Sequence, residues 1–149
     1  MSESSQVFVF QNHVTQAEWE ALMGYNPSSV KDAERPVDNI TWHEAITFCN
    51  KLSVRDGFDI VYKNNFVNDM SAKGYRLPTE IEWEAAFNLN TTQFYDWCTD
   101  IWKQTADAID LFDLHTSDHR IIKRELFTRD FNNVNSKRAN LSFRVCRLL

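Results

Sequence analysis

The sequence predicts an α+β fold in one domain spanning residues 1–149. Helix-start signals dominate the chain up to Asn90, and short apolar runs typical of strands dominate the remainder. Eleven Phe, five Trp and four Tyr supply a strongly aromatic core. Because the chain has only three Gly and three Pro, repeat and low-complexity architectures are excluded.

Three capping boxes predict three short helices. In each box a Thr is followed three residues later by a Glu, at Thr15-Gln-Ala-Glu18, Thr41-Trp-His-Glu44 and Thr79-Glu-Ile-Glu82. This spacing satisfies two orphan amides at a helix start reciprocally. Gly24 stops the first helix and Gly57 the second.

Apolar periodicity predicts which face each helix buries. The expected buried residues are Trp19, Leu22 and Met23 in the first helix; Ala45, Phe48, Cys49 and Leu52 in the second; and Ile81 and Ala85, with Trp83 and Phe87, in the third. Cys49 therefore has a packing role, as most buried free cysteines do.

The strand signals are shorter. Val7–Phe10 is β-prone, and Tyr95–Trp102 alternates aromatic and polar residues as a half-buried strand does. A strand starts at Ile121-Ile122 and ends at Leu126-Phe127, and Leu141–Arg147 forms a terminal strand with Leu141, Phe143 and Val145 on one face. Asn132–Asn135 is predicted as a loop, and residues 104–119 fit a short helix or a loop.

Charge and composition narrow the function classes. The net charge of −5, with both signs interspersed until the C-terminal third, argues against nucleic-acid binding. The N-terminus lacks a basic and apolar secretory pattern, and no apolar run is long enough to span a membrane. Three cysteines with no CxxC pair indicate reduced thiols. We therefore expect a cytoplasmic protein.

Seven blocks of sequence resemble one family in order. They are Val14–Trp19, Met23–Ser28, Arg35–Ala45, Phe48–Leu52, Gly74–Ala86, Asp96–Asp100 and Phe143–Arg147. These blocks are similar to the formylglycine-generating enzyme family (the sulfatase-modifying factor domain), whose fold is a variant of the C-type lectin fold. The resemblance implies a compact C-type lectin-like domain with three short helices and small antiparallel sheets.

This chain is a shortened version of that family's pattern. Only six residues precede Val7, where family members carry a Gly-rich opening strand, and the long stretch before the Asp-Trp-Cys block shrinks to 87–95. We expect these omissions to uncover apolar surface and to favour a homodimer or a hetero-complex.

The family's oxidase activity depends on a copper-binding cysteine pair in the C-terminal third. Soft thiolates suit Cu(I), but residues 120–142 contain no cysteine, and Cys98 and Cys146 fall inside scaffold blocks. The histidine-bearing helical domain of an iron-dependent branch is also absent. We therefore predict no catalytic residue, no metal and no cofactor.

Two other groups invite a chemical interpretation. His115 and His119, with Asp113 and Asp118, have a metal-ligand spacing, but a solvated acidic loop or helix end explains them better. The glutamates at 80, 82 and 84 suggest acid–base catalysis, but capping and the helix dipole account for them.

The C-terminal third is basic, and the preceding residues 96–118 are acidic. An internal salt-bridge network between them is the favoured interpretation, and a surface for an acidic partner is the alternative. Within the family fold, residues 129–140 occupy the exposed groove, and similar Asn-rich stretches vary in retroelement-diversified ligand-display proteins.

We therefore expect a catalytically degenerate binding or protein-interaction module, whose partner is a protein or a small ligand. Ligand display through 129–140 is one alternative, and an oxidase or other metal-dependent enzyme with a non-family site is another. The predicted binding residues are Trp97, Trp102, Arg129, Asn133, Asn135 and Arg138.

Overall fold

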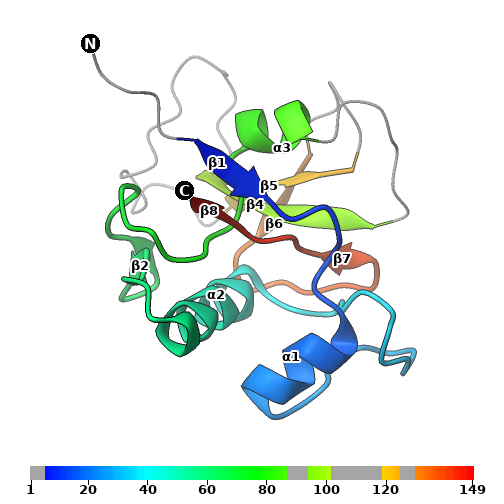
Figure 1. The fold of residues 1–149 in the computed structure, drawn as a ribbon. Coiled ribbons are helices and arrows are strands. Elements are labelled where there is room, and N and C mark those ends of the chain that lie inside the picture. Colours follow the sequence, from blue (N-terminus) through cyan, green and yellow to red (C-terminus); the bar gives the residue numbers. More distant parts are fainter. Residues whose placement is uncertain (1–5, 87–93, 102–118, 125–129) are drawn as a thin grey trace.

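A computed structural model describes residues 6–86, 94–101, 119–124 and 130–149. It confirms the α+β class, with helices and small sheets packed around one main core. Figure 1 shows α1 and α2 on one side of the β1–β8 pair and α3 on the other. Within the described ranges, no helix is long and apolar enough to cross a membrane.

The three capping boxes form as predicted. Helix α1 spans Gln16–Met23 and α2 spans Trp42–Asp56; Thr15 and Thr41 cap them, and Gly24 and Gly57 end them in left-handed conformations. Helix α3 spans Glu80–Ala86. Its box is complete, because Glu82 N donates to Thr79 Oγ1 (3.2 Å) and Thr79 N donates to Glu82 Oε1 (2.8 Å).

The described strands form three small sheets. One antiparallel pair joins β1 (Val7–Val9) to β8 (Cys146–Leu148). The largest sheet has the order β6-β5-β4-β7, with bounds Asp130–Asn133, His119–Lys123, Tyr95–Ile101 and Leu141–Ser142. Its β4–β7 pair is parallel, whereas its other two pairs are antiparallel.

The third sheet is a hairpin, which the sequence analysis did not predict. Strands β2 (Tyr62–Lys63) and β3 (Phe66–Val67) are joined by Asn64 and Asn65, which have φ values of 54° and 66°. A two-residue turn of this kind needs positive φ at both positions, and Asn tolerates it best among residues with a side chain. The Asn-Asn pair was the available signal.

Aromatic side chains from distant segments form the core. The Trp19 and Phe48 rings stack with their centroids 5.4 Å apart, and Phe143 meets both edge-on. The buried stripe of α2 is confirmed, since Ala45, Phe48 and Cys49 are buried and Leu52 packs partly buried against the core. Such edge-on and stacked pairs fix ring orientation as well as burying apolar area.

The predicted inner face of α3 is wrong for Ile81 and Ala85 and correct for Trp83. Ile81 is 74% exposed and Ala85 is also exposed, whereas Trp83 is fully buried against Cys98 and Ile121. In a helix this short, one large ring decides which side packs, and Ile81 lies on the other side. Phe87 lies outside the described residues.

Three strand predictions also need correction. Residues 96–100 of β4 are buried, not half-buried, because the main core covers one face and the Trp83 cluster the other. The terminal run divides into β7 and β8, which join different sheets, and residues 141–146 are buried throughout. Asn132 and Asn133 belong to β6, because ladder pairing with β5 overrides their local turn preference. The predicted end of β5 at Leu126-Phe127 lies outside the described residues.

Candidate binding surface

The exposed segment 130–140 is held by backbone contacts at its first half. Strand β6 pairs with β5 from Asp130 opposite Ile122 to Asn133 opposite His119. The chain then turns, with the Asn133 side-chain oxygen accepting from Asn135 N at 2.8 Å and the Asn133 carbonyl accepting from Ser136 N at 3.0 Å. This Asx turn fixes the backbone locally.

The second half of the segment is held by residues far away in the sequence. The buried Asp38 carboxylate accepts from Asn140 N at 3.0 Å, and the Asn140 carbonyl accepts from Tyr95 N at 2.7 Å. The Arg138 carbonyl accepts from Asn39 N at 3.1 Å. The backbone of 130–140 is therefore anchored along its length to the rigid core.

Most side chains of this segment are exposed or half-buried, whereas Val134 is buried in the core. Phe131 is 43% exposed. The other exposed residues of the segment are Asn135, Ser136, Lys137, Ala139 and Asn140. A fixed backbone that presents polar and aromatic side chains is the arrangement from which binding proteins obtain affinity without a large ordering cost.

An aromatic and cationic edge adjoins the end of this segment. The guanidinium carbons of Arg138 and Arg124 lie 4.6 Å and 4.7 Å from the centroid of the Tyr95 ring. Arg35 lies over the neighbouring Phe94 ring at 5.6 Å. These cation–π contacts hold the guanidinium groups in place beside the aromatic rings.

The predicted binding residues do not all meet at this surface. Asn133, Asn135 and Arg138 belong to the anchored segment. Trp97 is fully buried, and its indole N–H donates to the Ile40 carbonyl at 3.2 Å, so this residue is part of the core and not of a surface. Trp102 and Arg129 lie outside the described residues. Sequence reasoning missed Tyr95, whose aromatic character next to a basic C-terminal third was the available signal.

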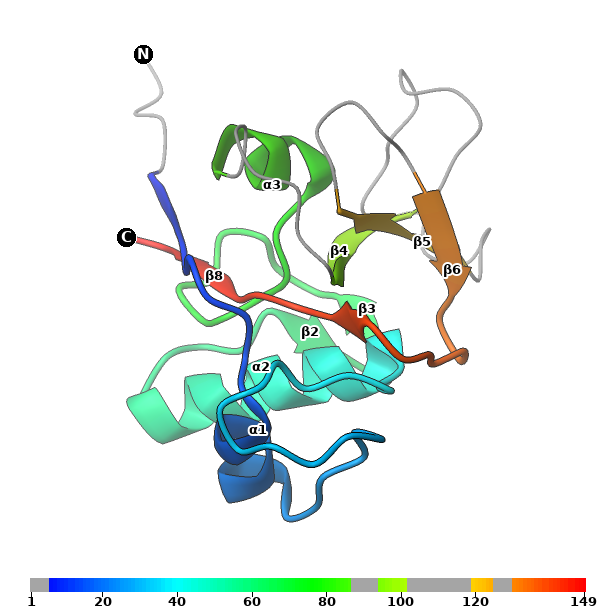
Figure 2. The ribbon, with the colours of Figure 1, turned by 90° about the vertical axis from the view of Figure 1, so that its right-hand side faces the viewer.

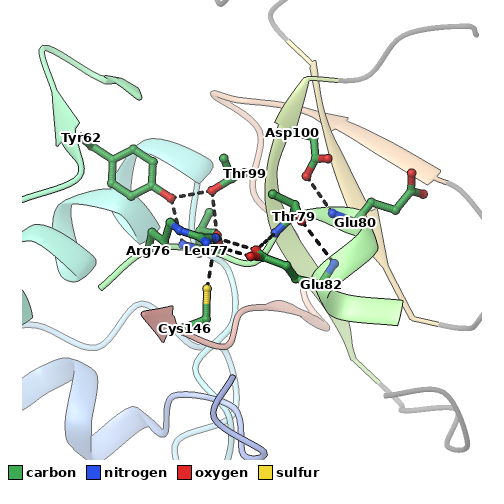
Figure 3. Close-up of polar contacts among 9 residues, drawn as sticks. All are labelled: Tyr62, Arg76, Leu77, Thr79, Glu80, Glu82, Thr99, Asp100 and Cys146. Carbon is green, nitrogen blue, oxygen red and sulfur yellow. Dashed lines mark hydrogen bonds and ion pairs between the residues drawn. The ribbon is translucent and has the colours of Figure 1, made fainter. Parts of the chain in front are cut away.

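A buried polar cluster surrounds the loop before α3 (Figure 3). Arg76 is 2% exposed and makes a bidentate ion pair with Glu82, with N–O distances of 2.6 Å and 2.8 Å. It also donates to the Cys146 sulfur at 3.3 Å. Glu82 therefore closes the helix cap and neutralises a buried cation, which is a role that the sequence pattern did not reveal.

The rest of this cluster is equally occupied by structural contacts. The Tyr62 hydroxyl accepts from Leu77 N at 2.9 Å and lies 2.6 Å from Thr99 Oγ1. Asp100 accepts from Glu80 N at 2.9 Å, and burial raises the pKa of its carboxyl to about 7. Each polar group here serves a neighbouring segment, as buried networks require.

The three thiols do not fit the copper chemistry of the family. Cys49, Cys98 and Cys146 are each fully buried and unpaired. Burial raises the pKa of Cys146 to about 12 and the pKa of Cys49 and of Cys98 well above the usual range. A Cu(I) site needs accessible thiolates, so the residues present do not form one.

Ion pairs bear out part of the predicted network. Asp96 is fully buried and pairs with Arg144 at 3.2 Å and His13 at 2.5 Å. Lys123, also fully buried, pairs instead with α3, at 2.7 Å from Glu84 and 3.4 Å from Glu80. Most of the acidic stretch 96–118 lies outside the described residues.

Of the predicted histidine pair and its two aspartates, only His119 lies within the described residues. His119 lies in β5 with its ring 5.3 Å from that of Phe131, while Asp113, His115 and Asp118 lie outside the described residues. Within the described ranges, no group of three potential ligands could hold a metal ion.

The fold and the surface define a C-type lectin-like domain that presents a loop on a rigid core. Residues 3–142 match the family described as the sulfatase-modifying factor enzyme 1-like domain, and the chain belongs to that family.

Solved structures share the fold. Treponema denticola variable protein 1 superposes with a TM-score of 0.76 at 20% identity, covering 95% of this chain and 84% of that chain. CarF superposes with a TM-score of 0.72 at 14% identity, covering 95% and 86%. In sequence, the chaperone protein LppX of Paenibacillus barcinonensis is 37% identical over 100 residues, covering 55% of this chain. The matched part is about a third (36%) of the length of that curated relative.

Proposed function

We propose that this domain is a non-catalytic binding module, and that residues 130–140 with Tyr95 form its binding face. The observation that carries the proposal is the anchored backbone of 130–140, whose ends are held by β5, Asp38 and Tyr95 while its side chains, apart from that of Val134, are exposed or half-buried. Loops fixed on a rigid scaffold in this way are where binding residues concentrate.

Two further facts support a binding role over an enzymatic one. The buried thiols with raised pKa values do not offer the nucleophilic or metal-binding thiolates of the family's oxidase. The relatives include one named a chaperone and one named a variable protein, which are names compatible with binding other molecules.

The binding face is tested by cross-linking in the producing cells. Surface variants are compared by whether each still forms the species in which the protein is cross-linked to a partner. We expect a triple variant, with Asn135, Lys137 and Arg138 each changed to Ala, to lose the cross-linked species while remaining folded. A matched control changes the exposed Lys51, Lys63 and Asn68 to Ala and should retain it. Equal loss in both variants, or no loss in either, contradicts the assignment of this face.

The absence of oxidase activity is tested separately. Purified protein loaded with Cu(I) and supplied with oxygen and a Cys-containing peptide should leave the peptide unchanged by mass spectrometry. Conversion of that cysteine to formylglycine would overturn the non-catalytic proposal. Metal analysis of the purified protein tests the alternative of a different metal-dependent site.

Ligand display is a second candidate function. The similarity to Treponema denticola variable protein 1 favours it, because the match spans 95% of this chain. This hypothesis predicts that residues 129–140 vary between copies of the gene, beside a reverse transcriptase and a template repeat. An ordinary gene neighbourhood argues against it.

The cytoplasmic location expected from the reduced thiols stays a prediction.

A further inference from the structure

A second surface of the molecule carries a pocket of about 500 Å³, with apolar and polar lining residues, between α1, α2 and the chain that follows β1. Its floor consists of the buried side chains of Val14, Phe48, Tyr75 and Val145. Phe10, Leu22 and Leu52 stand at its walls, and Phe10 is 37% exposed. The volume is that of a ligand site.

This pocket is separate from the proposed binding face. None of its lining residues comes from β4, β5 or the segment 130–140. In Figure 2, α1 lies at the bottom of the molecule, whereas β6 lies at the upper right. An occupant of the pocket would therefore leave the 130–140 face open.

Unpaired backbone groups lie at the edge of the pocket. The chain between β1 and α1 is held by Phe10 N, which donates to the Val145 carbonyl (3.0 Å), and by Val14 N, which donates to the Phe143 carbonyl (3.1 Å). Between these bonds, residues 11–13 line the pocket, and their main-chain N–H and C=O groups have no protein hydrogen-bond partner within the described ranges. Gln11 and Asn12 lie in a bend, so a peptide backbone laid beside residues 11–13 could pair with these groups one by one, without forming a regular strand ladder.

The charged groups around the pocket are already engaged. The Glu18 carboxylate accepts from Thr15 N and Thr15 Oγ1 in the α1 cap. Arg55 pairs with Asp56 at 2.9 Å, and the Asp56 carboxylate also accepts from the Tyr75 hydroxyl at 2.7 Å. His13, which also lines the pocket, pairs with the buried Asp96, so all of these groups are engaged within the protein and an occupant needs no net charge.

We infer that this pocket binds an extended peptide segment of a partner protein. An uncharged apolar side chain of that peptide, such as Leu or Phe, enters between Phe10, Leu22 and Leu52. Its backbone pairs with the free groups of residues 11–13. The main-chain bonds supply affinity, and the pocket supplies selectivity for the side chain.

The test uses blocked pentapeptides, acetyl-Gly-Ser-X-Ser-Gly-amide, with X as Leu, Phe, Asp or Lys. Binding is followed by the amide NMR shifts of the whole 149-residue chain. We expect the Leu and Phe peptides to shift the amides of residues 11–13, with at least about tenfold higher affinity than the Asp and Lys peptides. Shifts in the 130–140 segment are not expected, so failure here does not bear on the proposed binding face.

Two variants and one modified peptide separate the possible outcomes. Ala21→Phe fills the pocket from α1 and should lower the affinity about tenfold or more, whereas Ala17→Phe, an exposed position on the same helix that does not line the pocket, should leave it unchanged. A Leu peptide N-methylated at X should bind more weakly. Equal binding of the N-methylated peptide would show a site for apolar small molecules and would overturn the peptide assignment. No shift at residues 11–13 with any peptide would overturn the pocket itself.

Discussion

At the scale of single residues, Gly74 marks the closest approach between the loop before α3 and a neighbouring segment. A methyl group there would overlap the Asp59 carbonyl oxygen and lie 2.7 Å from Ser53 Oγ. We expect Gly74→Ala to lower the free energy of unfolding by about 2–3 kcal/mol, because backbone must move to admit it. Gly24→Ala is the control: it meets no atom within 4 Å but has a φ of 87°, and should cost about 1 kcal/mol. Urea denaturation of both variants measures the difference.

At the same scale, the buried Asp100 carboxyl leads us to predict that the stability of the protein depends on pH. Burial raises its pKa from 3.8 to about 7, so the folded state holds a proton that the unfolded chain releases near pH 4. The contribution of this group is therefore fully present below pH 4 and is lost as the pH rises to 7. Asp100→Asn should gain stability relative to the wild type by a few kcal/mol between pH 4 and pH 8. Denaturant midpoints at several pH values measure it, and a constant difference would contradict the buried carboxyl.

At the scale of elements, α3 depends on Glu82 for its cap and for the charge that balances Arg76. Glu82→Gln keeps a capping side chain but leaves the buried guanidinium without its carboxylate. We expect Glu82→Gln to lower the free energy of unfolding by about 2–3 kcal/mol. This loss is smaller than that for breaking a fully buried ion pair, because the Glu82 side chain is 20% exposed. In the equivalent box of α1, Glu18 forms no ion pair with any residue that the structure describes, so Glu18→Gln should cost under about 0.5 kcal/mol. Equal losses would show that capping alone accounts for Glu82.

At the scale of the whole molecule, exposed apolar residues make the association state testable. Phe8 is 49% exposed on β1, next to a groove that α3 also lines. We propose that the chain self-associates here, since contiguous apolar surface of this kind is usually covered. Light scattering at micromolar concentration should give the mass of a dimer, and Phe8→Ser should give that of a monomer. Val54→Ser, 70% exposed on α2, is the control. A monomeric mass for the unaltered protein would contradict this proposal.

Local chemistry explains which parts of the fold were predictable. A capping box and a positive-φ glycine operate over three or four residues, so the starts of α1, α2 and α3 and the ends at Gly24 and Gly57 followed from adjacent positions. The buried face of α2 was predictable because its apolar residues recur at helical spacing along the sequence. The binding surface was predictable only in part, because Asn133, Asn135 and Arg138 lie within six residues of one another in the sequence, whereas Tyr95 reaches the same edge through tertiary contacts.

The sequence by itself determined the helix starts, the family and the lack of a cysteine pair in residues 120–142. Only the tertiary structure decided that Trp97 is buried in the core and that Ile81 is exposed. It also decided that the terminal strand divides between two sheets and that Arg76 forms an ion pair with Glu82. The physical reason is that capping depends on neighbours along the chain, whereas burial and pairing depend on which distant segments share a face. The pocket beside residues 11–13 belongs to the second kind, since α1, α2, Tyr75 and Val145 assemble it from far-apart positions.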